Sequence, residues 1–180
     1  DRHKEALTHL TYGLQGAGGF VMLTGEVGTG KTTVSRALVQ SLTDDTIVGY
    51  IHNPAISELE LLATLCDEFK LVYDKQQLSL KVLFDLLHHY LLDNCRQDKS
   101  CVVIIDEAQL LSTPALEQLR LLTNLDVEHK KLLHIVLIGQ PELQQKLTQP
   151  ELRQLAQRIT ARYHLLPLTE AELVSYVAYR

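Results

Sequence analysis

Short apolar runs alternate along the chain with longer stretches in which apolar residues recur every three or four positions. The runs have the length and composition of buried strands, and the stretches have the periodicity of amphipathic helices. Strands are expected at 20–24, 46–51, 101–105 and 133–138, with a short fifth strand at 163–166. Strands that alternate with helices in this way predict a three-layer α/β fold around a mostly parallel five-stranded sheet with helices on both faces.

Segments with helical periodicity fill the stretches between the apolar runs. Helices are expected at 2–15, 114–124 and 151–161, and from the end of a glycine-rich turn to about residue 42. Further helices are expected to begin near residues 57 and 80, after 141 (a short one) and at 169. Two of them begin with the Ser/Thr-x-x-Glu spacing of a capping box, at Ser57–Glu60 and Thr169–Glu172. Ligands of parallel sheets bind beyond the carboxyl ends of the strands, so the chemistry is expected there.

The composition limits the classes of protein to which the chain can belong. Its 180 residues are enough for one domain, with room for a fragment of a second. The 17 basic and 22 acidic residues give a net charge of −5, which argues against a broad nucleic-acid surface although not against a local basic patch. Tryptophan is absent and aromatic residues make up only 6%, which disfavours a base-stacking platform.

Cysteine usage indicates a cytoplasmic location. Cys66, Cys95 and Cys101 are an odd number without Cys-x-x-Cys spacing, which favours reduced, buried thiols over a disulfide framework or a zinc site. No apolar run approaches the roughly 18 residues that a membrane-spanning helix needs. Because the chain begins with Asp1 and not with Met, we expect it to be a piece of a longer protein.

A glycine-rich turn at 25–32, GEVGTGKT, matches the G-x-x-x-x-G-K-[ST] pattern (Walker A) between an expected strand and an expected helix. Its glycines allow a backbone in which successive N–H groups point inward as an anion nest, and the helix adds its positive end. Lys31 is expected to reach the β- and γ-phosphates, and the Thr32 hydroxyl to bind Mg²⁺. The alternative is a glycine turn with a chance lysine. The predicted nucleotide contacts are Gly25, Glu26, Val27, Gly28, Thr29, Gly30, Lys31, Thr32 and Thr33.

Asp106 and Glu107 directly follow the apolar run at 101–105, which is a Walker B pattern. Asp106 is expected to hold Mg²⁺ through water, opposite the glycine-rich turn, so Asp106 and Thr32 form the predicted metal site. Glu107 is the predicted base that polarises the attacking water, with positioning more important than a shifted pKa. An ordinary polar strand end is the alternative.

Gln140 follows the fourth apolar run. If that strand lies beside both the strand of the glycine-rich turn and the strand of the acids, the Gln140 amide is placed to contact the γ-phosphate or to orient the water. The alternative is a polar residue that merely begins the loop before Pro141.

The chain resembles the AAA+ ATPases of the P-loop NTPase fold, and within them the general secretion pathway protein A group, which includes an ATPase of mannose-sensitive pilus biogenesis. The stretches that carry the resemblance are His3–Leu14, Thr24–Thr33, Ile104–Gln109, Leu119–Leu125, Ile138–Leu143 and Gln157–Leu168. The resemblance implies an AAA+ nucleotide-binding core at 1–168 and the start of a truncated helical lid at 169–180. It also implies that the second sensor arginine lies outside this chain.

The resemblance further implies an ATPase with ATP and Mg²⁺ as cofactors. Gln140 would be its first sensor, and Arg158 or Arg162 would act in trans on a neighbour's nucleotide. Arg158 is preferred, and the spacing of four predicts that both arginines share one helix face, if the helix extends that far. The implied partners are further copies of the chain and proteins of a type II secretion or type IV pilus system, at the inner face of the inner membrane, with membrane contact only through regions outside this chain.

Two other functions share the same motifs. A DNA-associated AAA+ ATPase of the transposition target-selection type is the main alternative, although the net charge of −5 argues against direct DNA binding. A small-molecule kinase is the other, but no acceptor-binding signature is apparent. Tyr12 lies near the end of the first expected helix. It is expected either in the core or, as the resemblance to similar ATPases implies for the leading segment, against the adenine.

Overall fold

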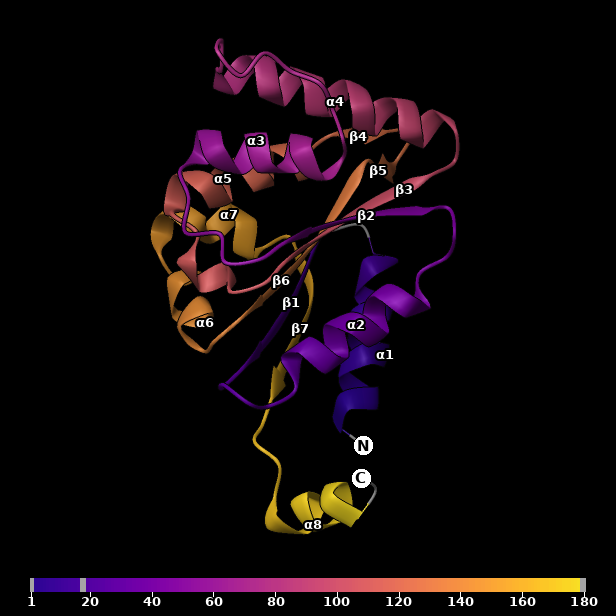
Figure 1. Cartoon of the computed structure of the whole chain (residues 1–180), viewed down its shortest axis with the longest axis vertical. Coiled ribbons are helices and arrows are strands. Elements are labelled where there is room, and N and C mark those ends of the chain that lie inside the picture. Colours follow the sequence, from indigo (N-terminus) through magenta and orange to yellow (C-terminus); the bar gives the residue numbers. More distant parts are fainter. Residues whose placement is uncertain (1, 17–18, 179–180) are drawn as a thin grey trace.

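The computed structural model describes residues 2–16 and 19–178 of the chain (Figure 1). Five parallel strands form one sheet in the order β2-β3-β6-β1-β7. Their bounds are β1 Phe20–Gly25, β2 Thr46–Ile51, β3 Ser100–Ile105, β6 Leu133–Gly139 and β7 Ile159–Leu165. The prediction of a parallel five-stranded α/β fold is therefore confirmed. A two-residue hairpin, β4 Asp126–Val127 and β5 Lys130–Lys131, was not predicted.

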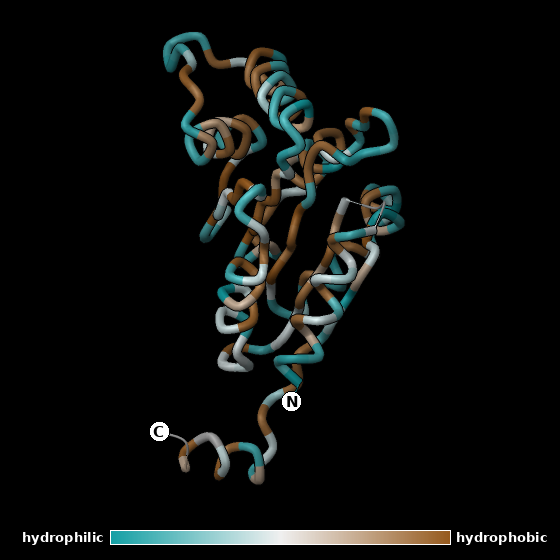
Figure 2. The backbone as a smooth tube through the Cα atoms, turned by 90° about the vertical axis from the view of Figure 1, so that its right-hand side faces the viewer, coloured by the Kyte–Doolittle hydropathy of each residue, from teal (hydrophilic) through white to brown (hydrophobic). Residues whose placement is uncertain are grey.

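Helices cover both faces of the sheet, because the side chains of each strand alternate between two cores. Phe20 and Met22 of β1 belong to one core, and Val21 and Leu23 to the other. The smaller core is covered by α1 (Arg2–Leu14) and α2 (Lys31–Ser41), which lie together on one side of the sheet in Figure 1. The helices of the larger core are α3 Glu58–Glu68, α4 Leu80–Arg96, α5 Thr113–Thr123, α6 Glu142–Lys146 and α7 Arg153–Ala156. Figure 2 shows the strands as a hydrophobic centre between these layers.

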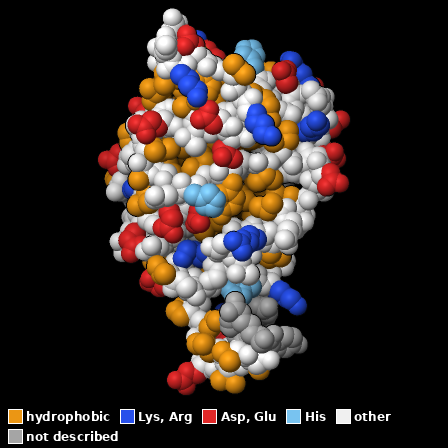
Figure 3. All heavy atoms as spheres, viewed as in Figure 1, with side chains coloured by type: hydrophobic (Ala, Val, Ile, Leu, Met, Phe, Trp, Pro, Cys, Tyr) orange, Lys and Arg blue, Asp and Glu red, His pale blue; other side chains and the backbone are white. Residues whose placement is uncertain are grey.

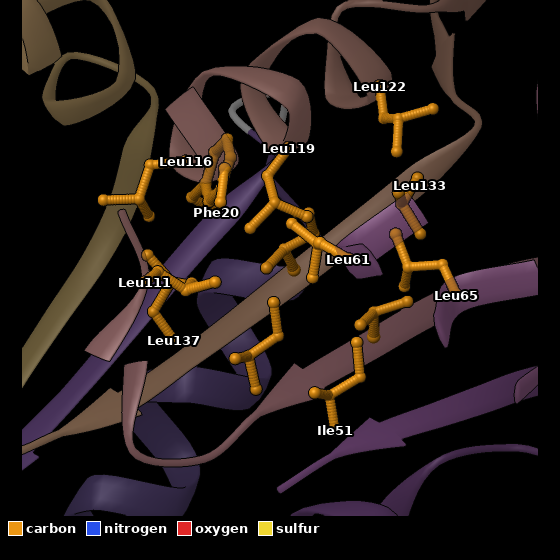
Figure 4. Packing of buried hydrophobic residues seen from close by; sticks show 14 of the residues in the cluster. Phe20, Ile51, Leu61, Leu65, Leu111, Leu116, Leu119, Leu122, Leu133 and Leu137 are labelled. Atoms are coloured by element: carbon orange, nitrogen blue, oxygen red, sulfur yellow. The ribbon is translucent and has the colours of Figure 1, made fainter. Parts of the chain in front are cut away.

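The larger core is dominated by leucines that come from helices on one side and strands on the other (Figure 4). Leu61 of α3 and Leu119 of α5 are completely buried against strand residues such as Leu137. Burying one such side chain stabilises the fold by about 1.5–3 kcal/mol. This core therefore fixes α3 and α5 on the sheet and holds the strand ends in register.

The register of the strands brings three loops to one edge of the sheet. Thr24 of β1 is paired with Gly139 of β6, and Leu137 of β6 with Ile105 of β3. Neighbouring strands lie about 4.8 Å apart, so the ends of β1 and β3 are separated by roughly 10 Å with the end of β6 between them.

The predicted helix over 151–161 is wrong. The structure has a 3₁₀ turn η2 (Pro150–Leu152), the four residues of α7, and then strand β7 from Ile159. Alternate residues of β7, such as Ala161 and Leu165, are buried, and β7 pairs along the whole length of β1. Pairing with an otherwise open sheet edge overrides a weak helical pattern. As a result Arg158 lies in a turn and Arg162 in a strand, and the expected shared helix face does not exist.

The last helix, α8 (Glu170–Ala178), stands apart from the helices that cover the sheet (Figure 1). It begins with the predicted capping box, in which the Thr169 N–H donates to Glu172 at 2.8 Å. Arg2 of α1 forms an ion pair with Glu172, with 3.7 Å between Nε and Oε1. Its Nη1 also donates to the Pro167 carbonyl at 3.2 Å. Apolar side chains gather on the surface over α8 (Figure 3), among them Val174, which is 71% exposed. Residues 179 and 180 of the expected lid segment lie outside the described residues.

None of the helices in the described part of the chain is both long and apolar enough to cross a membrane. Cys66, Cys95 and Cys101 are free thiols, as expected.

Close packing of α1 on the sheet depends on Gly13. A Cβ at this position would lie 2.5 Å from the Ala161 Cβ and 2.7 Å from Val21 Cγ1. We expect Gly13→Ala to lower the free energy of unfolding, because overpacking costs typically about 1–3 kcal/mol and alanine's helix propensity offsets at most about 1 kcal/mol. Urea denaturation measures the change.

Gly49 of β2 provides the matched control, since a Cβ there would make only an ordinary contact of 3.5 Å with Phe69. Gly49→Ala should leave the urea midpoint nearly unchanged. Equal midpoints for the two variants would show that α1 is not seated as closely as the structure has it.

Candidate nucleotide-binding site

The turn between β1 and α2 has the backbone of an anion-binding loop. Gly28 and Gly30 have φ angles of 80° and 94°, in the left-handed region that glycine adopts without strain. Gly30 is the N-cap of α2, so the turn leads directly into the positive end of that helix. A Cβ at Gly28 would meet nothing within 4 Å, which leaves its backbone open to a ligand. This geometry suits a phosphate group.

Other residues of the loop determine its shape. Thr29 is buried, and its hydroxyl donates to the Glu26 carbonyl at 2.8 Å. A Cβ at Gly25 would lie 2.5 Å from that hydroxyl oxygen, so the glycine makes room for the turn to close on itself. Val27 is 80% exposed at the tip of the loop. The Glu26 carbonyl is thus part of the hydrogen bonding within the loop.

The Lys31 ammonium lies inside the loop. Its Nζ donates to the Gly25 carbonyl at 2.7 Å and to the Glu26 carbonyl at 2.9 Å. A phosphate that enters the loop offers the ammonium charged acceptors, which form stronger hydrogen bonds than neutral carbonyls. Thr32 and Thr33 are exposed on the first turn of α2, on the same side as the loop.

The acidic pair follows β3 directly. Asp106 Oδ1 accepts the backbone N–H of Glu107 at 2.9 Å. Glu107 has a φ of 57°, a left-handed conformation that costs a non-glycine residue of order 1–3 kcal/mol and is concentrated at functional sites. Burial raises the pKa of Tyr50, a hydrogen bond with Ser35 of α2 lowers it, and the nearby Asp106 carboxylate raises it. The Asp106 carboxylate therefore lies near the Tyr50 hydroxyl, whose oxygen is 3.4 Å from Ser35 Oγ of α2.

Gln140 follows β6, which lies between β1 and β3 as its predicted role requires. Its backbone N–H donates to Gln109 Oε1 at 3.1 Å. Gln109 in the 3₁₀ turn η1 (Ala108–Leu110) in turn donates from Nε2 to Glu107 Oε2 at 2.6 Å. The structure thus connects Gln140 and Glu107 through Gln109. Sequence reasoning gave Gln109 no role, although it stands two residues after the base.

A cavity of about 740 Å³ opens beside the phosphate loop, within the roughly 300–1,000 Å³ of small-molecule sites. It lies between the start of α1, the loop and the segment that leads into α8. Its lining residues are Arg2, His3, Gly28, Thr29, Gly30, Thr33, Leu165, Leu166, Leu168, Ala171, Glu172 and Ser175. Apolar and polar groups of this kind suit a nucleoside whose phosphates occupy the adjoining loop.

His3 lines this cavity from α1, beside Arg2, and also contacts the loop. The His3 Nε2 atom lies 3.0 Å from the Thr29 carbonyl oxygen. A Cβ at Gly30 would lie 2.4 Å from the same His3 nitrogen. The expectation that Tyr12 packs in the core is wrong, because its side chain is 78% exposed. Tyr12 lies more than two helical turns from His3 and is not among the residues that line this cavity. The direction of α1, which runs away from the loop, could not be read from the sequence.

Neither candidate arginine is at the end of the sheet that carries the phosphate loop, since Arg162 pairs with Met22 in the middle of β1 and Arg158 lies farther away. Arg158 precedes β7, whose first residue pairs with Phe20, whereas the loop follows the other end of β1, roughly 17 Å away. Arg158 is half-buried and donates from Nη2 to Asn124 Oδ1 at 2.6 Å. Arg162 is exposed, donates to the Ala156 carbonyl at 2.9 Å and lines a shallow hollow of about 270 Å³ with Arg153.

The residues at the sheet edge fit a magnesium nucleotide. A hydroxyl on Thr32 and a carboxylate on Asp106 are hard oxygen donors of the kind Mg²⁺ prefers. No group of three or more His, Cys, Asp or Glu side chains that could hold a metal occurs among the described residues. This sparse donor set matches a cation that keeps several waters and takes its other ligands from phosphate oxygens.

Comparison with known proteins identifies one family and a long stretch of similarity. The family described as AAA domain matches residues 14–147. The chain is 63% identical over its whole length to the general secretion pathway protein A of Aeromonas hydrophila, of which it covers 33%. This identity confirms the resemblance drawn from the motifs, although the chain spans only about a third of the length of this curated relative.

Solved structures share the fold at low identity. The Cdc6p structure from Pyrobaculum aerophilum has a TM-score of 0.77 at 18% identity, over 98% of this chain and 48% of that one. The ORC1 protein of Aeropyrum pernix, solved in complex with DNA, has a TM-score of 0.72 at 18% identity, over 99% of this chain and 47% of that one. These likenesses show the fold alone, and the DNA in the second structure belongs to that protein.

The contact of His3 with the loop predicts a role in nucleotide affinity. We expect His3→Ala to weaken ADP binding by about 2- to 10-fold, the effect of one net hydrogen bond of roughly 0.5–1.5 kcal/mol. His9→Ala on the same helix is the matched control, because His9 packs beside Tyr163 and not on the loop. Titration calorimetry measures both, and equal affinities for the two variants would contradict the assignment.

Proposed function

Because the chain belongs to the AAA domain family, we propose that it binds ATP with Mg²⁺ and hydrolyses it. The observation that carries this proposal is the strand order, in which β6 lies between β1 and β3. It brings the loop of Lys31, the amide of Gln140 and the acids after β3 to the same edge of the sheet.

The proposed binding mode divides the nucleotide between two parts of the site. The phosphates lie in the loop at 25–32, held by backbone N–H groups, by the positive end of α2 and by the Lys31 ammonium. The nucleoside lies in the adjoining cavity, against His3 and the segment that leads into α8. Thr33 lines the same cavity from the first turn of α2.

The proposed chemistry is the transfer of the γ-phosphoryl group to water. Thr32 and Asp106 would hold the Mg²⁺ ion, which supplies charge neutralisation between the β- and γ-phosphates when it is bound. Glu107 orients the attacking water and accepts its proton, and Gln140 contacts the γ-phosphate from between the two motifs. In such reactions positioning and electrostatic stabilisation account for most of the rate enhancement.

The name of the Aeromonas relative supports a role in secretion. We propose that this module energises or switches the assembly of a bacterial type II secretion or type IV pilus system, at the cytoplasmic side of the membrane. Residues 1–168 would form the nucleotide-binding core and the segment from 169 the start of a helical lid.

Self-association is the last part of the proposal. Arg158 precedes β7 at the opposite end of β1 from the loop of its own chain, and the Arg162 guanidinium is held by the Ala156 carbonyl, which supports a role on a neighbour's nucleotide. Arg158 remains the first candidate, since its Nη1 atom is buried without a hydrogen-bond partner among the described atoms. A guanidinium that is held in place and still has an unpaired N–H group is suited to donate a hydrogen bond to a phosphate oxygen.

Two substitutions separate binding from turnover. Glu107→Gln should retain ATP affinity but lower the turnover number at least about 100-fold, because a positioned general base contributes about 10²–10⁴-fold. Lys31→Ala should instead abolish nucleotide binding. Calorimetry and phosphate release measure the two effects, with Glu60→Gln on the exposed face of α3 as the control. Normal phosphate release by the Glu107 variant would remove that residue from its role.

The trans arginine is tested by mixing two defective chains. Arg158→Ala should bind ATP normally but turn it over about 10³–10⁵-fold more slowly once assembled, the range typical of an arginine finger. Asn124→Ala removes the same hydrogen bond within the chain but keeps the guanidinium, so it should stay active. Adding Lys31→Ala chains, which carry an intact Arg158, should restore phosphate release. The same mixing experiment is done with Arg162→Ala chains. If the chains associate and phosphate release is restored for Arg162→Ala but not for Arg158→Ala, the trans role belongs to Arg162.

A further inference from the structure

We propose that Gln109 is a positioning residue, which holds the Glu107 carboxylate in place and ties it to the backbone of Gln140. The inference rests on the proposed function of Glu107 as the base. It deepens that function by naming the residue through which the base is connected to the γ-phosphate sensor.

The Gln109 amide makes one contact on each side. Its Oε1 accepts the Gln140 N–H at 3.1 Å, and its Nε2 donates to Glu107 Oε2 at 2.6 Å. A backbone N–H can only donate and an ionised carboxylate can only accept, so one orientation of the amide satisfies both partners. An acidic side chain in this place would bring an acceptor against the carboxylate. Asparagine would be one methylene too short to reach both.

Glu107 needs such a partner because its own backbone does not settle the position of its side chain. The residue is in the left-handed region with a φ of 57°, and its N–H is already bonded to Asp106. The bond to Gln109 uses one carboxylate oxygen. The other oxygen is then available to accept a proton from water, since each carboxylate oxygen can accept hydrogen bonds.

The surroundings of Gln109 are shaped for this close approach. Gly139 ends β6, and a Cβ there would lie 2.6 Å from Gln109 Oε1. Lys146 of α6 donates from Nζ to the Gln109 carbonyl at 2.8 Å and also to the Leu111 carbonyl. The turn that carries Gln109 is therefore fixed to the helix that follows Gln140, independently of the amide contact.

These contacts give the link a function. Gln140 is the residue proposed to contact the γ-phosphate, and its backbone N–H is the anchor of the Gln109 amide. A displacement of Gln140 when the γ-phosphate arrives or leaves is therefore transmitted through one side chain to the base. The link makes the alignment of Glu107 depend on the occupancy of the γ-phosphate site.

The test uses two variants that differ in shape. Gln109→Met keeps the volume of the side chain and removes both hydrogen bonds, and Gln109→Ala removes the volume as well. We expect both to lower the turnover number by about 10- to 100-fold, a part of the 10²–10⁴-fold that a general base supplies. The KM and the ATP affinity should stay within about twofold, because no nucleotide contact is lost. Steady-state phosphate release and calorimetry give this split.

Gln118→Ala is the matched control. Gln118 is equally half-buried and donates to a glutamate, Glu58 Oε2, at 3.3 Å, but it lies on α5 away from the site. Its loss should leave the turnover number unchanged. Normal turnover by Gln109→Met would overturn the inference, because the hydrogen bonds would then have no effect. A parallel loss of ATP affinity or of melting temperature would overturn it too, since Gln109 would be a structural residue only.

A double-mutant cycle with Glu107→Gln shows whether Gln109 acts through the base. In that background, Gln109→Met should cause no further fall in single-turnover rate. An equal fall in both backgrounds would contradict the inference while leaving the proposed ATPase function intact. A wild-type chain that binds ATP and does not hydrolyse it would contradict the proposed function, and this inference with it.

Discussion

The parallel pairing of β6 between β1 and β3 is the constraint on which the rest of the structure depends. Each of these strands is followed by one part of the site: Lys31 and its loop after β1, Gln140 after β6 and the acids after β3. The pairing is enforced by two buried cores, because a slip of one residue would turn every apolar side chain to the wrong face. Packing of leucines in the core therefore determines how the three loops of the proposed site lie relative to one another.

The proposed site at the sheet edge contains uncommon backbone conformations, of which that of Glu107 is strained and those of the glycines are not. The left-handed conformation of Glu107 and those of Gly28 and Gly30 occur directly after buried strands or before a helix. Rigid neighbours allow such conformations to persist, and the resulting alignment is present before a ligand binds. Gln109 adds side-chain hydrogen bonds to this arrangement, since it connects the loop after β3 to the loop after β6. Activity is in this view a property of the sheet edge as a whole.

Much of the fold could be predicted from the sequence, because local pattern and tertiary structure agree in most of it. The four apolar runs at 20–24, 46–51, 101–105 and 133–138 and the capping boxes are examples in which the local signal is strong. The fifth strand was underestimated because Ile159 and Thr160 follow residues with helical periodicity, and only the open edge of β1 decides between the two structures. The phosphate loop and the acidic pair are contiguous motifs and could be located by spacing. His3 and Gln109 could not be assigned, since their roles come from the direction of α1 and from a contact across two loops.

The central claim is that two separate stretches of chain meet around one magnesium nucleoside triphosphate. A crystal structure of the chain with Mg²⁺ and a non-hydrolysable ATP analogue tests it most directly. The account predicts that the third phosphate lies between Lys31 and Gln140, with the metal ion on Thr32 and its water ligands on Asp106. A triphosphate bound in the loop with its third phosphate directed away from Asp106 and Glu107 would contradict the account.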